Sequence, residues 1–177
     1  MKPDNPEILK MCSHPNPDTR VWAAKRIDPT LLPQMIRDRY SNVRYEVAKR
    51  IDSSWLPEMM GDEDWMIRGV VSYRIDPSRL SEMMEDPNWS VRCAVARRID
   101  SSRLPEMMGD LEWAVRIEVA KRIDPSRISE MMMDPEWAVR HQVVYRIPSR
   151  FVALMFIRDT NPDVRNVLRK RLDSIEP

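Results

Sequence analysis

Glycine, cysteine and histidine are scarce in this chain of 177 residues, and each shortage excludes a class of site. The three glycines provide no glycine-rich phosphate loop and leave little room for the tight turns of β-hairpins. The two cysteines, Cys12 and Cys93, are too few for a disulfide framework or a complete cysteine-based zinc or iron–sulfur site. The two histidines, His14 and His141, lie far apart, and no group of His, Cys and Asp has metal-ligand spacing. We therefore expect no enzyme activity, no cofactor and no metal.

Net charge and long apolar runs are also lacking. The 29 lysines and arginines nearly balance the 28 aspartates and glutamates, so the net charge of +1 favours neither an acidic nor a basic partner. No apolar run approaches membrane-spanning length, and the first residues contain no apolar signal region. The sequence therefore predicts a cytoplasmic protein with reduced cysteines and no membrane segment.

What the chain has in quantity is a repeat of 24 residues. An arginine marks each copy, and we call its position zero. Arginine recurs at position +6, isoleucine or leucine at +7, and aspartate at −6, where the first copy has His14. A longer period lies above this one, because segment 52–99 closely resembles 100–147. The zero positions, the last of which follows after 25 residues, are Arg20, Arg44, Arg68, Arg92, Arg116, Arg140 and Arg165.

Each repeat predicts one α-helix followed by one shorter helix. In the first half, Asp86 suits a helix N-cap and Pro87 suits the first turn, and apolar residues at −1, +3, +4 and +7 share one helical face. In the second half, Pro105 would interrupt a continuous α-helix, which favours a 3₁₀ turn. Units of this kind bury their apolar faces only against neighbours. We therefore predict an all-α solenoid of about seven repeats.

We expect this solenoid to form a single domain over residues 1–177. It divides into an N-terminal half-repeat cap at 1–14, regular repeats over 15–147, and an atypical repeat and cap at 148–177. In the last part, the apolar segment 151–157 predicts an α-helix that closes the core, which we favour over a partner-binding patch. Position +4 is small in most repeats but is Arg169 in the last copy, where a charge can face water.

The arginine at position zero lies inside the apolar arc of its helix. A buried charge is costly unless it is paired, and the planar guanidinium can bind a carboxylate and carbonyls together. Aspartates at −6 and at +8 are the available partners. We predict an Arg–Asp ladder with a structural role, and we favour it over a row of anion sites. The predicted members are Arg44, Arg68, Arg92, Arg116, Arg140, Asp62, Asp86, Asp110 and Asp134.

Two apolar rows admit a functional interpretation. Tryptophans at −3 could stack on bases, and the methionine pairs could form an adaptable groove. Because both rows recur at core spacing, we expect them to pack between repeats, with one methionine of each pair exposed and Cys12 in the core. The rows comprise Trp65, Trp89, Trp113 and Trp137, and the pairs Met59/Met60, Met83/Met84, Met107/Met108 and Met131/Met132.

We expect function in the columns that packing leaves free. Positions +1 and +2 vary among the repeats, and position +5 holds basic residues with two tyrosines interleaved. Beside the arginines at +6, position +5 forms a basic ridge that could follow a phosphate backbone. We favour instead a solvated face whose arginines pair with neighbouring aspartates. The candidate partner-binding residues are Tyr45, Lys49, Tyr73, Arg97, Lys121, His141, Tyr145 and Lys170.

The repeat unit, with its Val-Arg-x-x-Val-Ala-x-Arg-Ile-Asp-Pro-Ser-Arg-Leu core, resembles the leucine-rich repeat variant family over about residues 4–173. The resemblance implies alternating α- and 3₁₀-helices in a right-handed superhelix and a bacterial source. The founding type carries an N-terminal cysteine cluster for an iron–sulfur centre, whereas Cys12 stands alone here, so no redox role carries over. Our first hypothesis is a monomeric, non-enzymatic scaffold that binds a protein or peptide. The alternative is a solenoid that binds nucleic acid through the basic ridge.

Overall fold

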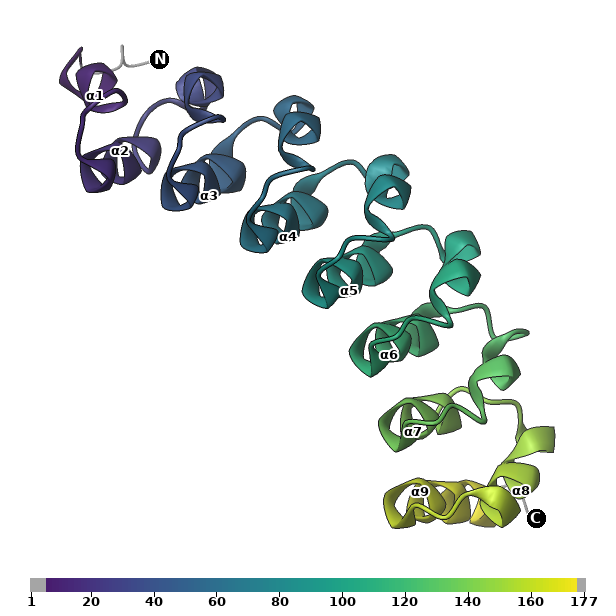
Figure 1. Ribbon diagram of the computed structural model, residues 1–177. Coiled ribbons are helices and arrows are strands. Elements are labelled where there is room, and N and C mark those ends of the chain that lie inside the picture. Colours follow the sequence, from purple (N-terminus) through teal and green to yellow (C-terminus); the bar gives the residue numbers. More distant parts are fainter. Residues whose placement is uncertain (1–5, 175–177) are drawn as a thin grey trace. The chain divides into compact units, whose positions relative to one another are not determined.

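The computed structural model describes residues 6–174, and every regular element within this range is a helix (Figure 1). α-Helices alternate with 3₁₀ helices through most of the chain, as the proline positions predict. The α-helices are α1 (Pro6–Met11), α2 (Pro17–Ala24), α3 (Ser41–Arg50), α4 (Trp65–Arg74), α5 (Trp89–Arg98), α6 (Trp113–Arg122), α7 (Trp137–Val144), α8 (Ser149–Arg158) and α9 (Pro162–Asp173). The 3₁₀ helices are η1 (Pro29–Met35), η2 (Ser53–Met59), η3 (Pro77–Met83), η4 (Ser101–Met107) and η5 (Ile128–Met131).

The chain forms two compact units, unit 1 up to Val95 and unit 2 from Ala96, so the boundary falls within α5. In unit 1, α2 packs against α3 and α3 against α4; in unit 2, α6 packs against α7 and α7 against α9. Within each unit the α-helices lie side by side in one row and the 3₁₀ helices form a second row (Figure 1). The predicted single domain over 1–177 stays a prediction, and the outermost residues of both predicted caps, 1–5 and 175–177, lie outside the described residues.

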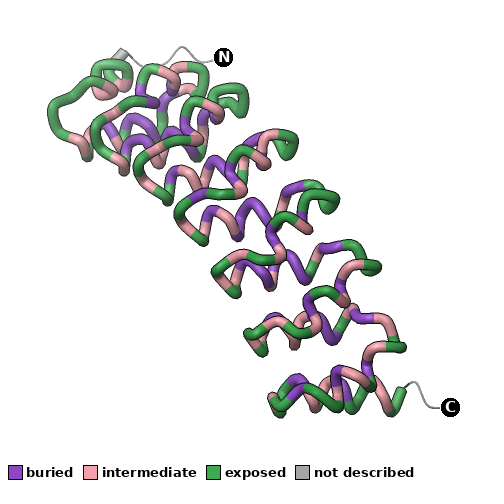
Figure 2. Tube along the Cα trace, turned by 45° about the vertical axis from the view of Figure 1, so that its right-hand side comes forward, coloured by how far each residue is buried: buried purple, intermediate pink, exposed green. Residues whose placement is uncertain are grey.

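The core lies between these two rows. The apolar columns at −1, +3 and +7 are inaccessible or nearly so, as Val43, Val47 and Ile51 illustrate, and η2 adds Leu56 and Met59 from the other row. In Figure 2 buried positions recur along the α-helices, whereas the connecting segments are mostly exposed. Each such aliphatic side chain contributes about 1.5–3 kcal/mol when it leaves water. Stacking of neighbouring repeats is therefore what stabilises each helix pair.

Local hydrogen bonds determine where the helices begin. Asp52 at position +8 accepts from the N–H of Ser54 and caps η2, and Pro57 lies inside that 3₁₀ helix. The α-helices start later than predicted: α4 begins at Trp65 and is capped by Asp64, which accepts from the Met66 N–H. The prediction that Asp86 at −6 caps its α-helix is wrong, because this column turns the preceding loop by accepting from the N–H two residues later, Asn88.

That later start changes the environment of the tryptophans. Each tryptophan at −3 is the first residue of its α-helix, at the edge of the apolar arc. Trp65, Trp89, Trp113 and Trp137 are 42–47% exposed, so the prediction that they are core residues between repeats is wrong. In the methionine pairs the first member is buried, as in Met59, but the second is half-buried, as in Met60, and not exposed as predicted. Cys12 is half-buried, so the prediction that it lies in the core is wrong.

The C-terminal part departs from the repeat. The segment 151–157 lies in the α-helix α8, as predicted, with Val152 and Met155 buried. Arg165, the last zero-position arginine, donates to the Phe156 carbonyl at 2.6 Å and lies 4.3 Å over the Phe156 ring. Arg169 at position +4 is exposed. Arg165 thus joins α9 to α8 through Phe156.

Candidate functional site on the face of the α-helices

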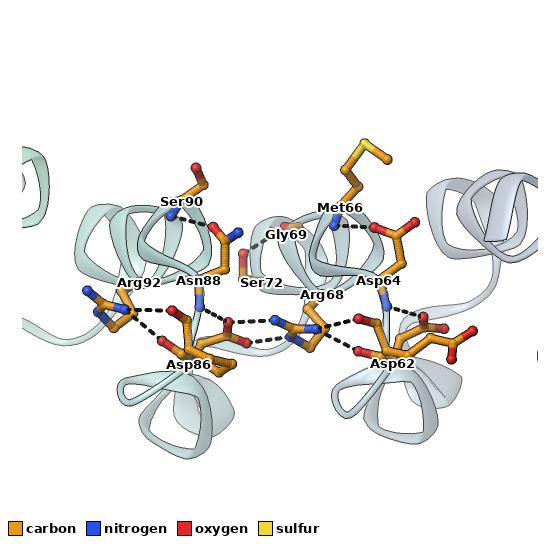
Figure 3. Close-up of polar contacts among 12 residues, drawn as sticks. Asp62, Asp64, Met66, Arg68, Gly69, Ser72, Asp86, Asn88, Ser90 and Arg92 are labelled. Atoms are coloured by element: carbon orange, nitrogen blue, oxygen red, sulfur yellow. Dashed lines mark hydrogen bonds and ion pairs between the residues drawn. The ribbon is translucent and has the colours of Figure 1, made fainter. Parts of the chain in front are cut away.

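The zero-position arginines join neighbouring repeats on the side of the α-helices that faces the 3₁₀ row. Arg44 donates from Nε to Asp62 Oδ2 at 2.7 Å, from Nη2 to Asp62 Oδ1 at 2.9 Å, and from Nη1 to the Asp38 carbonyl at 2.8 Å. Arg68 has the same contacts with Asp86 and with the carbonyl of Asp62 (Figure 3). The same bidentate pairs form between Arg20 and Asp38, Arg116 and Asp134, and Arg140 and Asp159.

The partner is therefore the aspartate at −6 of the following repeat. The aspartates at +8, the other candidates, cap 3₁₀ helices. Arg92 donates to the Asp86 carbonyl at 2.8 Å, and Asp110 accepts from the N–H of Glu112. The zero-position arginines bind backbone carbonyls and carboxylates that belong to the solenoid itself. Their role is therefore structural.

Ion pairing shifts the titration of the ladder. Burial alone would raise the pKa of the Asp38 carboxyl, but hydrogen bonds from Arg20 and the Tyr40 N–H hold that pKa below its ordinary value. Asp159 behaves alike: hydrogen bonds from Arg140 and the Asn161 N–H outweigh burial and lower its pKa. Both carboxyls are therefore ionised wherever the protein is folded near neutral pH.

The arginines at +6 also bind backbone groups of the solenoid. Arg74 donates from Nη1 to the Ala48 carbonyl at 2.5 Å and from Nη2 to the Ile51 carbonyl at 2.7 Å, at the end of the preceding α-helix. Such carbonyls lack a partner within their own helix and carry its negative dipole end. The same pair of bonds is made by Arg50, Arg122 and Arg146. The expectation that these arginines pair with neighbouring aspartates is therefore wrong, because their partners are backbone carbonyls, and the alternative basic ridge would consist of the +5 column alone.

Two buried glutamates organise the +5 column. In unit 1, Glu46 at +2 lies 3.8 Å from Lys25 Nζ and 3.4 Å from Lys49 Nζ. In unit 2, Glu118 Oε1 accepts from Arg97 at 3.1 Å and from Lys121 at 3.0 Å. Burial would raise the pKa of Glu118, but the hydrogen bonds from these two cations lower it. Each glutamate thus holds two exposed cations side by side on the face of the α-helices.

A third basic column lies away from this face. Arg79 in η3 forms a bidentate pair with Glu82 at 2.7 and 2.8 Å, and Arg103 and Arg127 pair in the same way with Glu106 and Glu130 within their own segments. These exposed pairs neutralise one another locally, so they add nothing to a basic surface beside the α-helices.

An aromatic series runs along α7. The rings of Trp137 and His141 are edge-to-face with centroids 6.3 Å apart, and those of His141 and Tyr145 are 5.2 Å apart. Beside this series lies an open groove of about 520 Å³ across α6, α7 and α9. Ile117 and Val167 supply apolar surface on either side of α7. Lys121, Gln142, Asp163 and Asn166 supply polar groups along the same groove.

Comparison with known proteins agrees with this architecture. A solved structure described as a leucine-rich repeat variant with a novel repetitive structural motif is similar with a TM-score of 0.88 and 29% identity, over 93% of this chain and 70% of that one. The chain has the leucine-rich repeat variant fold. The Escherichia coli protein YibA is similar in fold, with a TM-score of 0.56 and 16% identity over 92% of this chain and 79% of its own. No protein-family model matches the sequence, and no curated protein matches it.

The structure brings together only some of the predicted partner-binding residues. Lys121, His141 and Tyr145 meet around the groove of unit 2, and Arg97 joins Lys121 through Glu118. Tyr45 and Lys49 share α3, where the Lys49 ammonium lies 5.3 Å over the Tyr45 ring. Exposed Tyr73 lies on α4 in unit 1, and exposed Lys170 lies on α9 in unit 2.

Sequence reasoning missed Glu46, Glu118 and Trp137 as members of this surface. A usable signal was present for the glutamates, because they occupy the same column exactly three repeats apart. For Trp137, the regular recurrence of tryptophan at −3 favoured a core position, whereas the structure exposes this side chain. Among the residues that the structure describes, no helix is long and apolar enough to cross a membrane, and no group of three His, Cys, Asp or Glu residues could hold a metal ion.

Proposed function

We propose that this protein is a non-enzymatic scaffold that binds a protein or peptide on the face of its α-helices. The groove across α6, α7 and α9 carries this proposal. Its volume of about 520 Å³ suits several side chains of an extended peptide. Repeat solenoids commonly present their binding surfaces on one continuous row of elements.

The composition of the groove also suits a peptide. Trp137 is 42% exposed, and together with Ile117 it offers apolar area at the centre of the groove. Tryptophan is enriched among the residues that dominate binding energy, because it combines a large contact area with few rotatable bonds. The ammonium of Lys121 and the carboxylate of Asp163 border this area and can orient a partner through hydrogen bonds.

The nucleic-acid alternative receives less support. Binding along a phosphate backbone needs several exposed cations that release counterions. The +6 arginines instead bind carbonyls, and Lys49, Arg97 and Lys121 each share a buried glutamate. We therefore keep nucleic acid as an outcome to be distinguished by experiment.

Selection from a displayed library of random short peptides tests the scaffold proposal. We expect peptides that bind the wild-type chain to lose affinity when His141→Glu places a carboxylate in the groove. The matched control is Ala153→Glu, which adds the same group at an exposed position of α8 in the same unit. Failure to select any peptide, combined with salt-sensitive binding of a random-sequence oligonucleotide, would replace this proposal by the nucleic-acid alternative.

We further propose that the chain acts in the cytoplasm as a monomeric single domain. Sedimentation equilibrium across a range of concentrations tests the monomer. A mass that rises toward twice 21.0 kDa would contradict it.

A further inference from the structure

The exposed face of the α-helices has a period of three repeats, longer than the 24-residue period of the core. The +5 column follows the order cation, lysine, tyrosine and then repeats it: Lys25, Lys49 and Tyr73 in unit 1, and Arg97, Lys121 and Tyr145 in unit 2. In the +2 column only the glutamates recur at this spacing, as Glu46 and Glu118. Core packing does not require this period, because every repeat packs in the same way.

The contacts repeat with the residues. In each unit the glutamate side chain is 11–12% exposed and lies within ion-pair distance of the cation of its own helix and of the preceding repeat. The four cations remain 44–50% exposed. In each cluster a largely buried carboxylate thus contacts two exposed cations. The glutamate therefore positions the cations, and their outward donors can meet an acidic group from solution.

The next α-helix along each unit adds apolar surface. In unit 1 this is α4, which packs against α3 and carries Trp65 and Tyr73, 45% and 51% exposed. In unit 2 it is α7, which packs against α6, begins at Trp137 and is followed directly by Tyr145; these residues are 42% and 57% exposed. In unit 2, Lys121 and Trp137 line the same groove. In unit 1, the cationic pair and the two exposed aromatic residues lie on helices that pack in the same order, α2, α3 and α4.

We propose that this face carries two related binding sites, one in each unit, for a peptide segment that has Asp or Glu next to a bulky apolar residue. This inference rests on the proposed scaffold function and specifies its partner. The carboxylate contacts the cationic pair, and the apolar side chain packs on the tryptophan. The protein is therefore bivalent, and a partner that carries this segment twice gains avidity without any new contact.

The two sites differ at position +1 of the aromatic helix. Unit 2 has His141 there, between Trp137 and Tyr145, whereas unit 1 has Gly69. A Cβ added at Gly69 would meet no atom within 4 Å, so the site accepts a side chain. Replacing a helical glycine also favours the helix. Gly69→His therefore converts the unit 1 site toward that of unit 2.

Peptide selection and calorimetry test this inference. Peptides selected on the full chain from the random library are synthesised and titrated into the protein. We expect enrichment of Asp and Glu beside Trp, Phe or Leu, and two peptide molecules bound per chain. Lys49→Glu and Lys121→Glu should each remove one of the two, and Gly69→His should strengthen the unit 1 site by about tenfold.

Matched controls separate binding from folding. Arg79→Gln removes a cation of the 3₁₀ row and should leave both sites intact. Lys49→Gln and Lys121→Gln remove charge without placing a carboxylate beside Glu46 or Glu118, and circular dichroism confirms that each variant is folded.

The outcomes also separate this inference from the scaffold proposal. One peptide per chain, or peptides without acidic residues that ignore both lysine substitutions, would overturn the two-site inference and leave the scaffold proposal standing. Selection of no peptide would overturn both.

Discussion

Replacing Arg44 by leucine removes the guanidinium that joins two repeats of unit 1. Arg44 and Asp62 are 8% and 7% exposed, and the arginine donates two hydrogen bonds to the Asp62 carboxylate, one to the Asp38 carbonyl and one to exposed Glu63. In this pair, the hydrogen bond to Asp62 raises the pKa of the Arg44 guanidinium above its ordinary value. Removing one member leaves Asp62 buried with its N–H donor from Asp64 but without its counter-charge. We expect Arg44→Leu to lower the free energy of unfolding by about 3–5 kcal/mol.

A second substitution isolates the stranded charge. In the double variant Arg44→Leu/Asp62→Asn, the asparagine oxygen can still accept from the Asp64 N–H, but no buried charge remains. We expect the loss to fall to about 1–2 kcal/mol, the value of the neutral hydrogen bonds that are missing.

Urea unfolding followed by far-UV circular dichroism measures these differences. Repeat proteins can unfold in more than one step, so the fit should allow a separate transition for each unit. Arg79→Leu is the control, because it breaks an exposed pair, in which Arg79 and Glu82 are 40% and 49% exposed. The reasoning fails if Arg44→Leu costs no more than Arg79→Leu, or if Asp62→Asn does not recover stability.

Three further predictions concern pH, the helix ends and the exposed tryptophans. Because the folded pKa of Asp38 and Asp159 is lowered, the unfolded chain binds protons first. The urea midpoint should thus be flat above about pH 5 and fall as the pH decreases through about 4, with a shallower fall in Asp38→Asn. Arg74→Met should lower the free energy of unfolding by about 1–3 kcal/mol, because two carbonyls lose a charged donor; an unchanged urea midpoint would contradict this role. Trp137→Ala should destabilise the protein less than Val139→Ala, although it removes far more atoms, because Val139 is inaccessible and Trp137 is 42% exposed; the reverse order in thermal unfolding would place Trp137 in the core.

Secondary structure was predictable because its causes are local. Pro57 and Pro105 exclude a continuous α-helix wherever they stand, and the aspartates at +8 cap the segments that contain them. The α-helix start was misplaced by two residues because Asp86 and Asn88 are both plausible caps by residue type. Only the folded structure shows that Asp86 is not the cap, because its carboxylate binds Arg68 of the preceding repeat.

From the sequence, single residues of the site could be predicted, but the groove that they border could not. Lys49, Lys121, His141 and Tyr145 were recognised because they stand in columns that packing leaves free. The groove itself is formed by α6, α7 and α9 together. The hypothesis of an exposed ridge that includes the +6 arginines rested on their angular position on a single helix. That reasoning takes no account of the length of an arginine side chain and how far it can reach. In the structure that length lets Arg74 reach carbonyls of the neighbouring helix.

The sequence by itself determined the repeat, the alternation of α- and 3₁₀-helices, and the need for a partner at each arginine inside an apolar face. These follow from periodicity and from bonding that is local to one repeat. Tertiary structure alone decided that the partner is the aspartate of the following repeat, that the tryptophans stand half in solvent, and that a buried glutamate aligns two cations in each unit. Such contacts join residues about 18–26 positions apart on neighbouring repeats, and only stacking brings them within hydrogen-bond distance.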